Sequence, residues 1–152
     1  MKVRLFLMMS IVVIGMMACK NNEDLATVAD IAGNYEGYSL ASCAYFQDRC
    51  TDGELINVSD NGDGSAKVTF ASQQWGEFIV AKAQMTEEEG VYRLSGNGKV
   101  EMGMGENTSS YDFTFSATIK SINDSQMQFS VAGVMGGLTI DFATGEAPNT
   151  EE

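Results

Sequence analysis

The sequence predicts an all-β domain that closes into an antiparallel, up-and-down barrel of about eight strands. Apolar and polar residues alternate along most of the chain, which is the period of a strand with one buried face. Short runs rich in Gly, Asn and Asp separate the alternating stretches and predict turns. An open sheet would leave the apolar faces wet and two edges unpaired, and closure into a barrel removes both problems. A two-sheet sandwich is the competing architecture.

The clearest strand is residues 111–120, where every odd position except 117 is a large apolar residue and every even position is polar. In residues 91–104, Gly96 and Gly98 fall on the apolar side, where a missing side chain permits a sharp bend. The strands are expected at residues 33–40, 54–59, 66–70, 76–85, 91–104, 111–120, 127–131 and 138–142. Turns are expected at residues 60–64, 87–90, 105–107, 123–124 and 136–137, and a helical turn within residues 25–31.

The N-terminus predicts export. Lys2 and Arg4 precede an apolar run of about 13 residues, which is too short to span a bilayer and typical of a signal peptide. The run ends Met16-Met17-Ala18-Cys19, which resembles the lipobox of bacterial lipoproteins, with Met16 in place of the usual Leu. We therefore expect Cys19 to be acylated and to anchor the protein to the outer membrane. An ordinary secretory signal is the alternative.

These observations divide the chain into four parts. Residues 1–18 are expected to be a cleaved lipoprotein signal peptide, and residues 19–30 an acylated Cys with a flexible tether. Residues 31–145 are expected to form the barrel, and residues 146–152 a disordered tail. The polar, acidic stretch after Cys19 resembles the surface-export signals of Bacteroidetes-type lipoproteins. The protein is therefore expected in the cell envelope, either facing the periplasm or exposed on the cell surface.

The chain is acidic, with 9 Lys and Arg against 21 Asp and Glu, no His and a net charge of −12. Loss of the signal peptide removes Lys2 and Arg4 and leaves 7 − 21 = −14. Nucleic-acid binding requires basic patches that neutralise phosphate, and it is not expected here. The acidity favours solubility. Contact with the membrane is expected only through the lipid anchor. We expect the protein to be a monomer.

Two cysteines, Cys43 and Cys50, remain after lipidation of Cys19. An exported protein folds in an oxidising compartment, so the remaining pair predicts a disulfide that staples a short loop. Two free thiols are the alternative. The spacing differs from the Cys-x-x-Cys motif of redox proteins, and the chain lacks the His or second Cys pair that a zinc site would use.

Three segments carry a family resemblance. Residues 31–38 (IAGNYEGY), 90–98 (GVYRLSGNG) and 135–142 (MGGLTIDF) resemble the opening, middle and closing strands of calycin-like barrel domains in exported Bacteroidetes lipoproteins. The resemblance covers roughly residues 31–144 and implies a lipocalin-like barrel of eight strands. It implies no particular activity. Gly33-x-Tyr35 stands where lipocalins carry Gly-x-Trp.

The composition argues against catalysis, and no catalytic residue, metal site or cofactor is expected. Without His the chain cannot form a Ser-His-Asp or Cys-His arrangement, and no Gly-rich phosphate loop precedes a helix. Residues 59–64 resemble a calcium loop only superficially, because the twelfth position counted from Ser59 is Phe70 rather than Glu. The strand-borne acids are expected to face water.

Two functional hypotheses remain. The first is a non-catalytic module that contacts a protein or glycan through loop aromatics, with Tyr45, Phe46 and Trp75 as candidates. The alternative is a carrier of a small hydrophobic ligand or lipid inside the barrel. Its candidate interior residues are Tyr92, Leu94, Phe113, Phe115, Phe129 and Ile140. No polar anchor is predicted inside, which disfavours a polar ligand.

Overall fold

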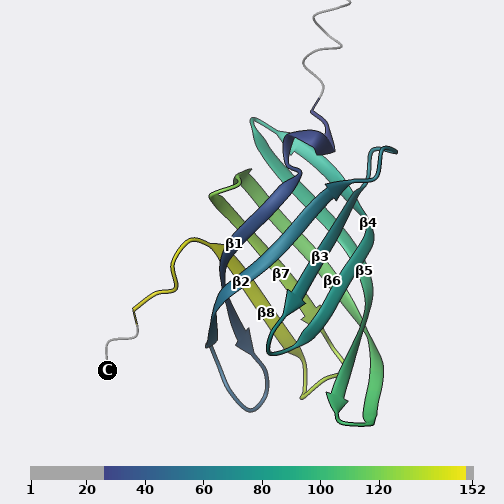
Figure 1. Ribbon diagram of the computed structural model, residues 1–152, viewed down its shortest axis with the longest axis vertical. Coiled ribbons are helices and arrows are strands. Elements are labelled where there is room, and N and C mark those ends of the chain that lie inside the picture. Colours follow the sequence, from purple (N-terminus) through teal and green to yellow (C-terminus); the bar gives the residue numbers. More distant parts are fainter. Residues whose placement is uncertain (1–25, 150–152) are drawn as a thin grey trace, which may run out of the picture.

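Eight antiparallel strands close into a barrel in which each strand pairs with its neighbours in the chain and β8 returns to β1 (Figure 1). The structure is a computed structural model that describes residues 26–149. The strands are β1 (Gly33–Ser42), β2 (Arg49–Asp60), β3 (Ala66–Ser72), β4 (Gly76–Glu88), β5 (Val91–Met104), β6 (Asn107–Ser121), β7 (Asp124–Val131) and β8 (Leu138–Thr144). Six residue pairs between β1 and β8 close the sheet. The predicted all-β up-and-down barrel is confirmed, and the sandwich is wrong.

The alternation in the sequence becomes an apolar inside and a polar outside. In β6, Phe113, Phe115, Ala117 and Ile119 are buried, whereas the polar residues that alternate with them face outward. The Phe129 ring lies at the centre of the interior, with its centroid 5.0–5.9 Å from the centroids of four other phenylalanine rings. Those four rings belong to Phe70, Phe78, Phe113 and Phe115. The interior of the barrel is therefore its hydrophobic core.

Gly96 and Gly98 allow β5 to lie very close to its neighbours. A Cβ atom on Gly96 would lie 2.6 Å from Val80 Cγ1, and one on Gly98 would lie 2.7 Å from Phe113 Cζ. Both distances are shorter than any real van der Waals contact. These two glycines thus serve close packing against β4 and the Phe113 ring, a role beyond the bend expected from the sequence.

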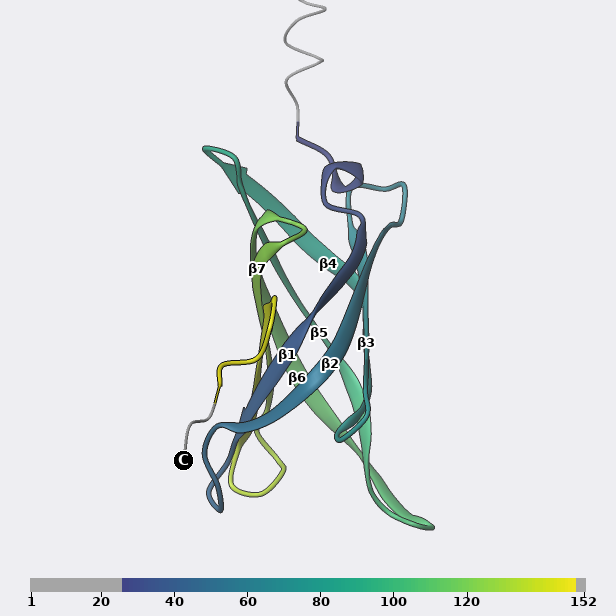
Figure 2. The same ribbon diagram turned by 60° about the vertical axis from the view of Figure 1, so that its left-hand side comes forward.

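The two ends of the barrel are built differently (Figures 1 and 2). The upper end, as drawn in Figure 1, carries the 3-10 helix η1 (Val28–Asp30), which confirms the predicted helical turn. Val28 and Ile31 are buried there, and the Tyr35 hydroxyl donates a hydrogen bond to the Ile31 carbonyl at 2.6 Å. The lower end carries the β1–β2, β3–β4, β5–β6 and β7–β8 connections. The described chain therefore enters at the end opposite these four connections.

The predicted disulfide is wrong, because Cys43 and Cys50 are free thiols. Cys50 is exposed on β2, where it pairs with the outward-facing Leu40. Cys43 lies just beyond β1 in a tight turn and packs partly against the core. Residues opposite each other on antiparallel strands share a face, so Cys50 points to the outer face while Cys43 turns inward.

The predicted signal peptide and lipidated Cys19 lie outside the described residues. Among residues 26–149, no helix combines the length and the apolar character needed to cross a bilayer.

Candidate interaction site

The structure brings two of the predicted loop aromatics together at the lower end of the barrel. Phe46, from the β1–β2 loop, stacks on Trp75, from the β3–β4 turn, with ring centroids 5.8 Å apart and planes inclined by 23°. The Arg49 guanidinium carbon lies 4.0 Å from the centroid of the Phe46 ring. Tyr45 lies beside Phe46 in the same loop, and its side chain is 79% exposed. Aromatic rings and an arginine therefore gather on one surface.

Hydrogen bonds to backbone atoms hold the loops that carry these rings. The Ser72 hydroxyl accepts hydrogen bonds from the backbone N–H groups of Gln74 and Trp75, at 3.3 and 3.2 Å, which fixes the β3–β4 turn. The Ala44 N–H donates to the Met135 carbonyl at 3.1 Å, which ties the β1–β2 loop to the β7–β8 loop. The loops that carry the aromatic residues are thus bonded to one another and to the barrel. The Tyr45 side chain is exposed, whereas Phe46 and Trp75 are partly buried and also pack against the core.

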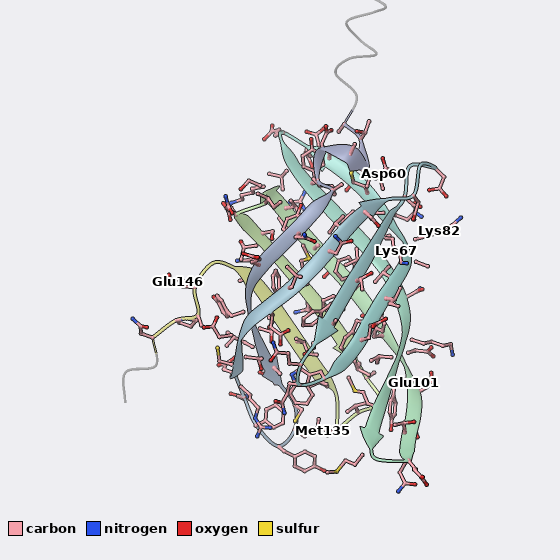
Figure 3. All side chains as sticks on the ribbon, viewed as in Figure 1. Asp60, Lys67, Lys82, Glu101, Met135 and Glu146 are labelled. Carbon is pink, nitrogen blue, oxygen red and sulfur yellow. The ribbon has the colours of Figure 1, made fainter. Side chains whose placement is uncertain are left out.

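A groove of about 560 Å³ opens next to the Trp75 ring. Its apolar lining comes from the β3–β4 and β7–β8 connections and from β5 and β6, and includes Trp75, Met102, Tyr111, Val134 and Met135. Figure 3 shows Met135 and Glu101 at this lower end. On the neighbouring β5–β6 hairpin, the Met104 side chain is 87% exposed. We call the surface formed by Tyr45, Phe46, Arg49, Trp75, Met104 and Met135 the lower-end patch.

Sequence reasoning missed the methionines of this patch. Met104 continues the apolar alternation of residues 91–104 and was expected on the same side as the core residues. It is exposed because β5 and β6 continue as a two-stranded hairpin past the last pairing of β6 with β7. Aromatic residues, Met and Arg are enriched at protein interfaces. The composition of the lower-end patch is therefore typical of a binding surface.

The six candidate residues for an interior cavity are distributed differently. Five of them are at most 2% exposed and pack within the core: Leu94, Phe113, Phe115, Phe129 and Ile140. Tyr92 lies at the upper end instead, where its hydroxyl donates a hydrogen bond to the Asp30 carboxylate at 3.3 Å. The residues expected to surround a ligand therefore fill the interior by contacting one another.

A buried carboxyl group lies inside the barrel, contrary to the expectation that the interior lacks polar anchors. Glu54 is 2% exposed, and its Oε1 accepts a hydrogen bond from the Ser72 hydroxyl at 3.3 Å. Burial raises the pKa of Glu54, and this effect exceeds the lowering by the hydrogen bond from Ser72. The Ser72 hydroxyl also accepts a hydrogen bond from the Trp75 backbone N–H. Ser72 therefore connects the Glu54 carboxyl group to the turn that carries Trp75.

The sequence contained a signal for this carboxyl group. Glu54 falls in phase with Ile56 and Val58, both of which are buried on β2. The Oε2 atom of Glu54, the hydroxyl of Ser39 and the indole N–H of Trp75 are buried without a hydrogen-bond partner among the described residues. In the same part of the chain, no group of three or more His, Cys, Asp or Glu side chains converges as metal ligands.

Comparison with known proteins finds one relevant structure. No protein-family model matches the chain, and no curated protein sequence does. A crystal structure from Bacteroides fragilis, described as that of a "putative outer membrane protein", is 32% identical and superposes with a TM-score of 0.65. The match covers 78% of this chain but only 45% of that one. The barrel is therefore similar to less than half of a longer Bacteroides protein.

Proposed function

We propose that this protein is a lipid-anchored, non-catalytic binding module of the bacterial cell envelope, and that the lower-end patch is its contact surface. The observation that carries the proposal is the convergence of Phe46, Trp75 and Arg49 next to the exposed Tyr45. Clustered aromatics with arginine are typical of the residues that dominate binding energy at interfaces. The fold is proposed to be calycin-like, as the sequence motifs suggest.

The envelope location is supported by two independent observations. The similar Bacteroides fragilis structure is described as a "putative outer membrane protein", and the first 19 residues resemble a lipoprotein signal with its lipidated cysteine. Residue 26 enters the barrel beside η1, at the end opposite the lower-end patch. An anchor at Cys19 would therefore be joined to the barrel at the end opposite the lower-end patch.

The outer face of the barrel favours an anchored protein over a membrane-spanning one. Outward positions on β6 and β7 are polar and exposed, among them Thr114, Ser116, Gln126 and Gln128. A spanning barrel needs an apolar band on its outer face and has a polar interior. This barrel has the opposite arrangement, with phenylalanines inside.

The location can be tested with the substitution Cys19→Ala. We expect the variant to be unacylated and to leave the membrane fraction, with its stability unchanged. Mass spectrometry of the purified protein measures the acyl chains directly. An acylated Cys19→Ala protein would contradict the lipid anchor.

The contact surface can be tested by site-specific photocrosslinking in the native bacterium. A photoreactive phenylalanine at Tyr45 or Met104 is expected to give discrete crosslinked species. The matched control is Ile122, an exposed apolar residue in the turn that joins β6 to β7 at the upper end. Equal crosslinking from Ile122 and Tyr45 would argue against a dedicated surface at the lower end.

A further inference from the structure

The β5–β6 hairpin has an unpaired edge at the lower end. β5 and β6 pair without interruption from Tyr92–Ile119 to Met104–Asn107. β7, however, pairs with β6 only from Thr114 onward. Residues 107–113 of β6 therefore have β5 on one side and no described strand on the other. Figures 1 and 2 show this hairpin standing out at the lower end of the barrel.

The free edge lacks the features that normally prevent strand addition. Exposed edges usually carry Lys, Pro or a bulge, because their free N–H and C=O groups can pair with another chain. Residues 107–110 read Asn-Thr-Ser-Ser, with neither a charge nor a proline, and their pairing with β5 has no register shift. The first charge along the edge is Asp112, and it is already paired with Lys99 at 3.3 Å.

The turn geometry indicates which backbone groups are free. The two-residue turn Gly105–Glu106 joins the paired residues Met104 and Asn107, so the flanking pair exchanges the hydrogen bonds nearest the turn. Hydrogen-bonding direction alternates along an antiparallel strand. The N–H groups of Thr108 and Ser110 therefore point away from β5, toward the free edge.

The surroundings of this edge define the chemistry of a partner. The apolar groove of Tyr111, Val134 and Met135 lies beside it and could take one large apolar side chain. The hairpin and its neighbour β4 contribute Glu77, Glu101 and Glu106, in addition to the Asp112–Lys99 ion pair, and the whole chain carries a net charge of −12. A second copy of this chain would bring the same acidic groups to the contact, so charge favours a different, basic partner.

We infer that residues 107–112 of β6 bind an extended, basic segment of a partner protein as an added β-strand. The segment pairs with the free N–H and C=O groups of β6 and inserts one apolar side chain into the groove of Tyr111, Val134 and Met135. This mode combines main-chain bonds for affinity with a side-chain pocket for specificity. The inference rests on the proposed function, since it assigns the kind of partner and the binding mode to the same lower end.

The test uses hydrogen exchange on the full-length protein in detergent, with the acetylated, amidated peptide Lys-Val-Lys-Phe-Lys-Val-Lys as the probe. The peptide is expected to slow exchange in residues 107–112 at least about tenfold. Replacing both Val by Pro removes two strand donors and should abolish the protection. Replacing the four Lys by Glu should do the same by charge repulsion. Strand addition would be overturned if the peptide did not slow hydrogen exchange in residues 107–112. It would also be overturned if the proline peptide slowed exchange there to the same extent.

Variants of the edge separate this inference from the proposed function. Ser110→Pro removes a free-edge donor and is expected to weaken peptide binding at least about tenfold, whereas Ser109→Ala should leave it unchanged. Ser110→Lys, which places a like charge beside the basic peptide, covers the case in which the proline variant fails to fold. Wild-type affinity in both Ser110 variants would overturn the inference. Crosslinks at Tyr45 without any effect at β6 would leave the proposed function standing and remove strand addition alone.

Discussion

At the scale of single residues, the Glu54 carboxyl group makes the protein's stability sensitive to pH. Burial raises its pKa above the ordinary value, so the folded state holds the proton more tightly than the unfolded state does. The resulting stabilisation is complete below the unfolded pKa and is lost as pH rises through the folded pKa. Each unit of difference between the two pKa values corresponds to about 1.4 kcal/mol.

The substitution Glu54→Gln is expected to flatten this dependence. Wild-type free energy of unfolding should fall as pH rises from about 4.5, and the variant should show a smaller fall over the same range. Urea unfolding at a series of pH values measures both. Asp63 serves as an internal contrast, because hydrogen bonds from Ser65 lower its pKa to about 2, and its contribution is lost only in more acidic solution. Identical slopes in wild type and variant would show that the Glu54 carboxyl group does not titrate differently on folding.

The sequence was sufficient to select the aromatic residues of the site but not to predict which of them contact one another. Phe46 and Trp75 could be selected because large aromatics in loops often mark binding surfaces. Their stacking depends on how the β1–β2 loop folds over the β3–β4 turn, which no local pattern encodes. Glu54 was missed although it lies in phase with Ile56 and Val58, because a charged residue at the end of a predicted strand was expected to face water.

At the scale of elements, the β2–β3 turn and an irregularity in β4 hold each other in place. The register between β3 and β4 shifts near Ala81, where two consecutive residues of β4 are exposed. The Asn61 side-chain amide bridges this site, donating to the Ala81 carbonyl at 2.8 Å and to the Ser65 hydroxyl at 3.0 Å. Lys82 and Asp63 add a surface ion pair at 3.2 Å.

The substitution Asn61→Ala removes both side-chain hydrogen bonds and is expected to lower the free energy of unfolding by about 1–2 kcal/mol. Denaturant unfolding at neutral pH measures the change. Asn123→Ala is the matched control, because Asn123 also lies in an exposed hairpin turn and bonds only through its backbone N–H. An equal effect of the two substitutions would assign the loss to turn propensity instead of the bridge.

The positions of the strands could be predicted from the alternation of apolar and polar residues, whereas the irregularities within the strands could not. All eight predicted strands are present, but β2 begins at Arg49 instead of residue 54, β6 at Asn107 instead of residue 111 and β7 at Asp124 instead of residue 127. The β1–β2 register shifts between Gly37 and Ser39, and Gly53 on the partner strand has a φ of 68°. An extra residue changes the phase of the pattern, so the sequence before it reads as a loop.

At the scale of the whole molecule, closure of the sheet brings the phenylalanine side chains of different strands together in one core. The pairing of β8 with β1 brings the inner faces of all eight strands toward one axis. The rings of Phe70, Phe78, Phe113 and Phe115 then meet around Phe129. Sequence alone predicted the closed sheet but left open whether its interior held a ligand, since ring-to-ring packing depends on the barrel's width and shear.

Removing the central ring should therefore cost stability and create space that the wild-type barrel lacks. Phe129→Ala is expected to lower the free energy of unfolding by about 3–5 kcal/mol, because a large side chain leaves a fully buried site. Leu55→Ala, at an outward position that is 45% exposed, is the control and should have a much smaller effect. Thermal and denaturant unfolding measure both.

The same variant distinguishes a filled barrel from a carrier. An engineered apolar cavity stays dry and binds small apolar molecules, so benzene should raise the melting temperature of Phe129→Ala. Benzene should leave the wild-type melting temperature unchanged, because the ring of Phe129 already occupies that space. A comparable rise in the wild-type protein would mean that the interior opens readily to apolar ligands. The interior residues, and not the lower-end patch, would then become the first candidates for the binding site.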